Sequence, residues 1–175
     1  SIVSLDIDTG IYKWHFQEIE HDLLNLDMAS APVLFQKNKK FLVIQATKSG
    51  QLILLDRSDG KPLEKYIEKI FYHSNDKSVF TKKKVFENWL QFSKNNFLKD
   101  DINSLSNNFL VDAKSIISKS IIYEYQKLSY SKNYIHYGFH GGNEWPGIGV
   151  SSEGNVIIPG NNIAWVSKLR DPSKF

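Results

Sequence analysis

Two short segments in the first third of the sequence collect residues whose types could do chemistry. Residues 21–27 read His-Asp-Leu-Leu-Asn-Leu-Asp and hold a histidine, two acids and an amide within seven positions. Residues 47–50 read Thr-Lys-Ser-Gly and place Lys48 at the end of a predicted strand, just before a glycine turn. Taken singly, the first segment is better explained as a polar hairpin and the second as a surface lysine.

A third segment, residues 140–147, reads His-Gly-Gly-Asn-Glu-Trp-Pro-Gly and flanks Asn143, Glu144 and Trp145 with glycines. Glycine lets a backbone approach a ligand closely, and an indole offers a flat stacking face. A glycine-rich turn around a core tryptophan is the plainer interpretation of the same residues.

Two further spacings suggest a metal site, but their context disfavours it. His136 and His140 are four positions apart, which on a helix would place both on one face. Glycines at 138, 141 and 142 argue against a helix there. Residues 6–10, Asp-Ile-Asp-Thr-Gly, open like a calcium loop but lack its glutamate at the twelfth position. Walker, dinucleotide-binding and nucleophile-elbow motifs are absent from the sequence.

The elements that must position these segments follow an internal repeat. Residues 1–10 read SIVSLDIDTG and residues 51–60 read QLILLDRSDG, at a period of 50 residues. Each unit is a short apolar strand, an aspartate and a polar turn closed by glycine, which supplies the positive φ that such turns need. Strand patterns also occur at residues 31–36 and 41–47. About four strands in one period is typical of a β-propeller blade, although a β-meander with two similar hairpins fits as well.

The middle of the chain breaks this strand pattern. Apolar residues at helical spacing in 83–98 and 110–127 predict two helices. Strand patterns return near the C-terminus. We therefore expect three parts: propeller blades in 1–62, a helical and loop insertion in 63–135, and a further blade in 136–175.

Composition limits the class of protein. An apolar fraction of 41% excludes a fully disordered chain, and no apolar run approaches the roughly 18 residues that cross a bilayer. Zero cysteines exclude disulfide scaffolds and thiolate metal sites. The net charge of +3 is spread among mixed charges and predicts a solvated surface with no nucleic-acid partner. Because the chain opens in an apolar run without a methionine, we expect a fragment of a longer protein.

Five ordered motifs resemble the pyrroloquinoline-quinone (PQQ)-dependent dehydrogenases, above all the membrane-bound glucose and related alcohol or sugar quinoproteins. The resemblance covers a little over half the chain and is weak over 66–135, where the family's arginine- and aromatic-rich segment is missing. The motifs occupy residues 6–14, 21–33, 45–63, 141–147 and 161–169.

The resemblance implies an all-β fold: an eight-bladed β-propeller, of which this chain supplies two to three blades of four-stranded antiparallel sheet, with the helical insertion. It also implies PQQ beside a calcium ion, and oxidation of a small alcohol or sugar by hydride transfer to PQQ. Electrons would pass to ubiquinone or a cytochrome. Family members work in the bacterial periplasm, and any membrane association would come through regions outside this chain.

Carried over residue by residue, the resemblance matches Lys48 to the lysine that contacts the quinone. Asn143, Glu144 and Trp145 match the segment that lines the quinone site, and are therefore expected to bind the cofactor.

Position 25 departs from the family. The pattern His-Asp-Leu-Trp-Asp reads His-Asp-Leu-Leu-Asn here, so Asn25 stands at the position of the catalytic aspartate. An amide oxygen is able to ligate calcium, but an amide does not accept a proton near neutral pH. Asp27 lies two residues on and points to the same side in an extended segment. We take Asn25 and Lys48 as the catalytic positions, with Asn25 also a calcium ligand.

Two functions remain open at this point. One is a quinoprotein dehydrogenase, favoured by Lys48 together with the glycine-flanked turn. The other is a non-catalytic or degenerate propeller that serves as a binding or scaffold protein, favoured by Asn25 and the missing arginine-rich segment. A plain β-rich binding module would require all five motifs to be coincidence.

Overall fold

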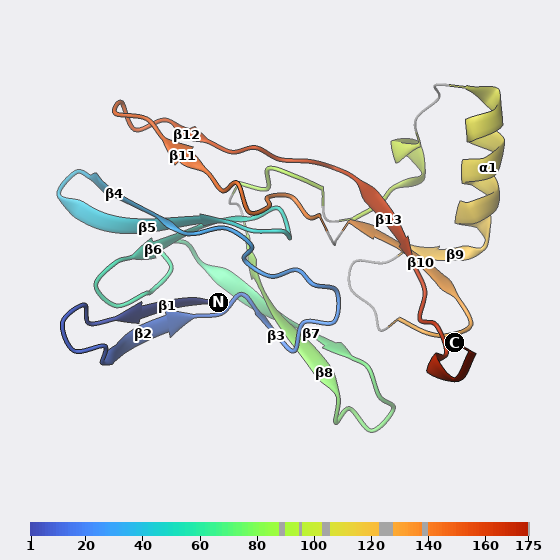
Figure 1. Ribbon diagram of the computed structural model, residues 1–175, viewed down its shortest axis with the longest axis horizontal. Helices are drawn as coiled ribbons and strands as arrows, with labels where there is room; N and C mark the ends of the chain where they lie inside the picture. Colours follow the sequence, from blue (N-terminus) through green and yellow to red (C-terminus); the bar gives the residue numbers. More distant parts are fainter. Residues whose placement is uncertain (88–89, 95, 103–105, 123–127, 138–139, 175) are drawn as a thin grey trace.

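Short strands grouped into five small sheets make up most of the chain in the computed structural model (Figure 1). The structure describes residues 1–87, 90–94, 96–102, 106–122, 128–137 and 140–174. The arrangement is nearly all-sheet with a single α-helix among these residues, consistent with part of a β-propeller.

The first half of the chain forms three antiparallel sheets: a hairpin of β1 and β2, a sheet ordered β4–β5–β6, and a sheet ordered β3–β8–β7. Their bounds are β1 Ile2–Leu5, β2 Tyr12–Phe16, β3 Ile19–Glu20, β4 Val33–Lys37, β5 Lys40–Ala46, β6 Leu52–Asp56, β7 Tyr66–Tyr72 and β8 Phe80–Phe86.

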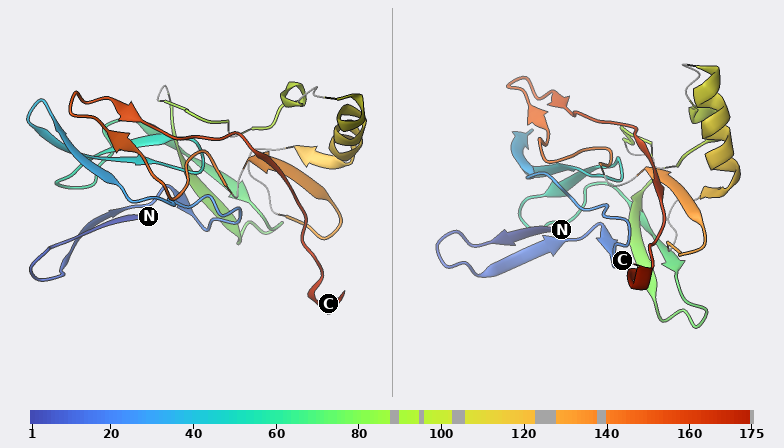
Figure 2. Two further views of the ribbon diagram at one scale, coloured as in Figure 1. Left: turned by 45° about the horizontal axis from the view of Figure 1, so that its top comes forward. Right: turned by 45° about the vertical axis from the view of Figure 1, so that its right-hand side comes forward.

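The second half forms two smaller sheets and the helix. Strand β10 lies between β13, antiparallel, and β9, parallel, while β11 and β12 form a separate hairpin. Helix α1 lies beside β9, at the opposite end of the molecule from the β1–β2 hairpin, in all views (Figures 1 and 2). The bounds are η1 Lys99–Asp101, α1 Asn107–Ser118, β9 Ser120–Ile122, β10 Asn133–Tyr137, β11 Gly149–Val150, β12 Val156–Ile157, β13 Ala164–Ser167 and η2 Pro172–Lys174.

The core joins elements that are far apart in the sequence. One cluster draws on β1, β2, β5, β6 and β8. A second joins the β4–β5–β6 sheet to the C-terminal hairpin, where Val150 and Val156 pack against Ile44 and Leu52. The two halves of the chain therefore share one hydrophobic cluster. The first cluster consists of Ile2, Trp14, Phe16, Val43, Ile53, Leu55 and Phe86.

The predicted repeat is confirmed at its turns. In both units the glycine N–H donates to the aspartate carbonyl, at 2.8 Å in the first and 2.9 Å in the second. Gly10 and Gly60 have φ of +69° and +70°. Beyond β6, Pro62 forms an isolated bridge with Leu55, and the Leu63 N–H donates to the Leu54 carbonyl at 2.9 Å. Among the described residues these contacts do not build a fourth strand, and the sheets hold two or three strands each.

The helix predicted at 83–98 is wrong over its first residues, because Phe80–Phe86 is strand β8. The alternation of β8 was hidden from the sequence because its buried face carries Thr81 and Lys83, at 0% and 2% exposure, in place of apolar side chains. No helix occurs in the described part of 90–98, and Trp89, which belonged to the predicted pattern, lies outside the described residues.

The second predicted helix is confirmed over 110–118 as part of α1, which begins at Asn107 and ends at Ser118. The prediction is wrong at Ser120–Ile122, which form strand β9 and pair with β10. Its N-cap, Ser106, accepts a hydrogen bond from the Phe109 N–H at 3.2 Å, and serine is a favoured residue at that position. Residues 123–127 of the prediction lie outside the described residues. The region 63–135 also contains the β7–β8 hairpin. The boundaries between the three predicted parts of the chain remain a prediction.

Candidate functional site

The site centres on Lys48, in the turn that joins β5 to β6. The Thr47 carbonyl accepts the Gly50 N–H at 3.0 Å, which closes the turn. The Lys48 side chain is only 7% exposed, and its Nζ lies 2.7 Å from Asp27 Oδ1 and 3.6 Å from Glu144 Oε1. One ammonium group therefore joins the three segments that the sequence singled out, 21–27, 47–50 and 140–147.

The glycine-rich segment packs directly on the backbone of Lys48. The Gly142 N–H donates to the Lys48 carbonyl at 2.7 Å. Gly141 has φ +47°, and a Cβ built there would lie 2.3 Å from Lys48 Cβ. Only glycine fits at this position, because a side chain would push the lysine out of place.

Asn143, expected to bind the cofactor, is 1% exposed and its side chain is occupied by the protein. Its Nδ2 donates to the carbonyls of Gly147 at 3.2 Å and Pro159 at 2.9 Å, and its Oδ1 accepts from Ser30 Oγ at 3.2 Å. This amide therefore shapes the turn that presents its neighbours. Trp145 is 79% exposed and so offers its indole to a ligand.

The segment 21–27 alternates between core and surface. Leu24 and Leu26 are buried, whereas Asn25 and Asp27 are exposed, so these two polar side chains point away from the core, although the backbone is not extended at Asn25 as predicted. Asp27 is the residue of the two that contacts Lys48. Asn25 has φ +56°, a region that asparagine enters more readily than most residues.

His21 and Asp22, at the start of this segment, serve its backbone geometry. Asp22 Oδ1 accepts the Leu24 N–H at 2.9 Å. The His21 carbonyl accepts from Thr81 Oγ1 at 2.7 Å, and its ring lies edge-on to Phe80. These contacts fix the segment to β8.

A cavity of about 200 Å³ lies next to this segment and is lined by Glu18, Asp22 and Asp27, among others. Cofactor pockets usually measure about 300–1,000 Å³. The cavity is therefore smaller than a usual cofactor pocket.

Among the residues that the structure describes, no group of three or more His, Asp or Glu side chains is arranged so that it could hold a metal ion. His136 lies in strand β10, so it shares no helix face with His140. Its Nε2 lies 2.8 Å from Ser167 Oγ, and burial lowers its pKa, against a smaller opposing effect of the Tyr137 carbonyl.

Glu18 is a site residue that the sequence analysis missed. It is 2% exposed and lies directly beneath the Lys48 turn, where its Oε1 accepts hydrogen bonds from Ser49, Gln51 and Thr47. Burial raises its pKa, although the charge of Lys83 and these hydrogen bonds act in the opposite direction. An isolated acid between two strands gave no signal in the sequence, because its partners lie some 30 residues or more away.

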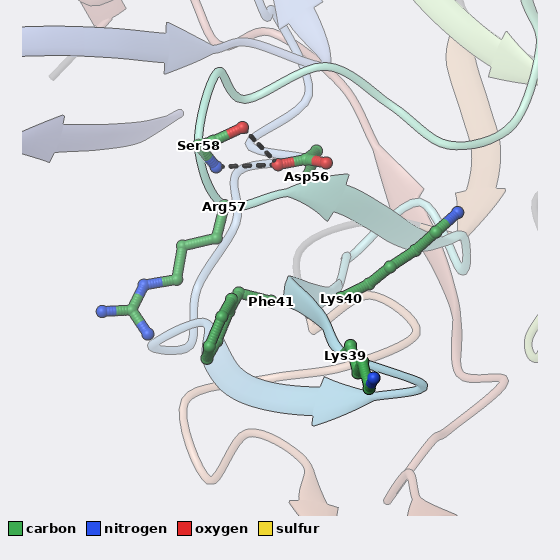
Figure 3. Close-up of a pocket in the computed structure, with 6 residues that line it drawn as sticks. All are labelled: Lys39, Lys40, Phe41, Asp56, Arg57 and Ser58. Carbon is green, nitrogen blue, oxygen red and sulfur yellow. Dashed lines mark hydrogen bonds between the residues drawn. The ribbon is translucent and has the colours of Figure 1, made fainter.

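A second hollow, of about 530 Å³, lies at the other end of strands β5 and β6 (Figure 3). It is lined by Lys39, Lys40, Phe41, Asp56, Arg57 and Ser58. The seven residues of β5 separate it from Lys48 by about 20 Å, at roughly 3.3 Å per residue. It is therefore no part of the lysine site.

The nearly all-sheet fold is consistent with part of a β-propeller domain. The protein-family model described as "PQQ: Glucose/ethanol/alcohol dehydrogenase, beta-propeller domain" matches residues 1–174. The chain belongs to this family of PQQ-dependent dehydrogenases.

Several curated relatives are quinoproteins. Over 191 aligned positions, the chain is 27% identical to quinoprotein glucose dehydrogenase A of Acinetobacter calcoaceticus, covering 99% of the chain and 24% of that protein. It is 40% identical over 73 residues to quinate/shikimate dehydrogenase (quinone) of Acinetobacter baylyi, covering 39% of the chain and 9% of the relative. Lupanine 17-hydroxylase [cytochrome c] of a Pseudomonas species is 39% identical over 67 residues, 35% of the chain and 9% of the relative.

The chain thus spans at most about a quarter of the length of these relatives. No solved structure gives a significant match to it.

Proposed function

We propose that the protein containing this chain is a quinoprotein dehydrogenase that oxidises an alcohol or sugar hydroxyl with PQQ. The observation that carries the proposal is the position of Lys48 Nζ, a nearly buried ammonium group at which three segments from different parts of the chain meet. Such a preorganised cation stabilises negative charge that develops on a reacting oxygen.

The residues present fit one side of a planar quinone. Lysine has three N–H donors. One N–H of Lys48 donates to Asp27 Oδ1, which lies 2.7 Å from Nζ. Glu144 Oε1 lies 3.6 Å from Nζ, a distance of an ion pair that is too long for a hydrogen bond. A donor of Lys48 therefore remains for a ligand oxygen. The exposed indole of Trp145 provides a stacking face on the neighbouring segment. When bound, PQQ supplies the hydride acceptor for the reaction.

Proton acceptance falls to Asp27 in this proposal. The amide of Asn25 has no basic oxygen near neutral pH, whereas Asp27 is a carboxylate that is half exposed and already aligned with the cation. Asn25 keeps the role of candidate calcium ligand through its amide oxygen, with the other ligands unassigned.

The electron acceptor and the location follow from relatives and resemblance alone. The names of the relatives include a quinone-linked and a cytochrome c-linked enzyme, which supports a quinone or a cytochrome as acceptor. We propose a periplasmic protein with a small alcohol or sugar as substrate. Among the described residues, no helix is long and apolar enough to cross a membrane.

A degenerate propeller that binds without catalysis is the second candidate. Asn25 favours it, because the family position for the base carries an amide that faces solvent. The two candidates differ in turnover and not in fold.

Dye reduction by the protein loaded with PQQ and calcium, over a panel of alcohols and sugars, separates them. We expect turnover with at least one substrate, and a higher turnover in Asn25→Asp because a carboxylate is restored at the family position. Absence of bound quinone by absorbance, in both the natural protein and Asn25→Asp, would overturn the proposal.

A further inference from the structure

The turn that carries Lys48 has two chemically different faces. Thr47, Ser49 and Gln51 direct their side chains to Glu18, while Lys48 points to Asp27 on the other side. Lys48 lies between Thr47 and Ser49 in the chain, so holding these two residues against Glu18 fixes the backbone that carries the lysine.

A single carboxylate oxygen holds that inner face. Glu18 Oε1 accepts from Gln51 Nε2 at 2.7 Å, from Thr47 Oγ1 at 3.4 Å and, in a short contact, from Ser49 Oγ. Thr47 Oγ1 and Ser49 Oγ also lie 2.9 Å apart. The carboxylate therefore connects residues on both sides of Lys48.

The same cluster ties the turn to strand β8. Gln51 Nε2 donates to the Lys84 carbonyl at 3.2 Å, and Gln51 Oε1 accepts the Phe86 N–H at 2.9 Å. The Glu18 carbonyl accepts the Lys84 N–H at 2.9 Å. The position of Lys48 thus depends on a strand that lies outside the three segments of the site.

Stability alone does not account for a carboxylate in this place. Glu18 is 2% exposed, and its second oxygen, Oε2, has no hydrogen-bond partner among the described residues. Burying an acid is costly, and the charge of Lys83, which is itself 2% exposed, offsets part of that cost. The three donors that converge on Oε1 give the acid a geometric role in addition.

We propose that Glu18 is a positioning residue for Lys48, which holds the turn 47–51 so that the lysine ammonium faces Asp27 and Glu144. The inference deepens the proposed function, because its catalytic consequence rests on the role of Lys48 there. Its structural content, the placement of Lys48 by Glu18, is testable without any quinone.

The direct test is the reactivity of the Lys48 amine toward an acylating reagent, measured by mass spectrometry on the intact protein. A lysine that is 7% exposed reacts slowly, and we expect several-fold faster labelling in Glu18→Ala, with a smaller rise in Glu18→Gln and Ser49→Ala. Glu20→Gln is the matched control, since Glu20 lies on the adjacent strand but pairs with Lys82 and Lys84, and labelling should stay at the natural rate. Lys61, which is 80% exposed, serves as the internal reference.

Folding is checked by hydrogen exchange of β5 and β6, which must stay protected. If Glu18→Ala does not fold, Glu18→Gln and Ser49→Ala decide. Natural labelling rates at Lys48 in folded Glu18→Gln and Ser49→Ala would overturn the proposal.

The affinity for PQQ, measured by fluorescence quenching of the full protein, tests whether Glu18 affects cofactor binding through Lys48. Glu18→Gln should weaken binding in the natural background and have no further effect in Lys48→Met, because a residue that acts through Lys48 has nothing left to position. Equal effects in both backgrounds would show a general structural role and contradict the proposal. Failure of the natural protein to bind PQQ would count against the proposed function, while the labelling result would still decide the role of Glu18.

Discussion

The two carboxylates on either side of the Lys48 turn, Glu18 and Asp27, occupy opposite environments. Glu18 is 2% exposed and accepts three hydrogen bonds from the turn. Asp27 has a side chain that is 51% exposed and binds only the lysine ammonium among the contacts that the structure describes. The buried acid fixes geometry, whereas the open one remains accessible to a ligand or a substrate proton.

This difference shows that the turn after β5 has one face that stabilises the fold and one face that is available for chemistry. The inner face is held by hydrogen bonds that join Gln51 to Glu18 and to strand β8. The outer face keeps a lysine donor and an exposed acid. Substitutions on the two faces should therefore have different signatures.

The largest effect is expected from the open face. Asp27→Asn removes the proposed proton acceptor and should lower turnover by about 10²- to 10⁴-fold, the usual contribution of a general base. Steady-state dye reduction measures it. Asp59→Asn is the matched control, because Asp59 forms a comparable pair with Lys61 at 2.6 Å in the second repeat turn. Equal turnover in Asp27→Asn and the natural protein would remove Asp27 from the mechanism.

On the buried face, Glu18 should make the free energy of unfolding depend on pH. Burial raises the Glu18 pKa above its ordinary 4.5, so the folded state holds the proton more tightly than the unfolded state. The free energy of unfolding that Glu18 contributes is then fully present below pH 4.5 and falls as pH rises through the raised pKa, by at most about 1.4 kcal/mol per pH unit.

Glu18→Gln should abolish this dependence, which is measured as the difference in unfolding free energy between the natural protein and the variant by urea titration at several pH values. The lowered pKa of His136 acts in the opposite direction, with stability lost as pH falls below its ordinary 6.5, but it is common to both proteins and cancels. A difference that does not change with pH would contradict the account of Glu18.

The smallest effect is expected from the backbone of the glycine-rich segment that packs on Lys48. Gly141→Ala and Gly154→Ala both place a side chain at positive φ, but only the first meets another residue, at 2.3 Å from Lys48 Cβ. Both variants should lose about 1 kcal/mol from backbone strain, and Gly141→Ala a further 1–3 kcal/mol or so from the steric clash. Thermal unfolding of the pair measures the gap, and equal losses would show that the turn yields without moving Lys48.

Much of the fold was predictable because its signals are local. The aspartate–glycine turns of the repeat appear in the structure with matching φ values at Gly10 and Gly60. Strand β8 was not predictable, since Thr81 and Lys83 occupy its buried face and break the apolar alternation.

The site was predictable only in part, because many of its contacts join residues that are far apart in the sequence. The approach of Lys48 to Glu144 agrees with the resemblance to the quinoproteins. The occupied amide of Asn143 and the cluster around Glu18 depend on partners from distant segments, which a single sequence does not reveal.

Binding of PQQ to the protein, compared with its Lys48→Met variant, tests the central claim most directly. Removing one partner of a hydrogen-bonded charge pair costs about 2–5 kcal/mol, so the account predicts saturable binding that weakens by about 30- to 4,000-fold in Lys48→Met. Lys61→Met should bind PQQ like the natural protein, since Lys61 is exposed and pairs with Asp59. Equal affinity of the natural protein and Lys48→Met would contradict the placement of the quinone at Lys48.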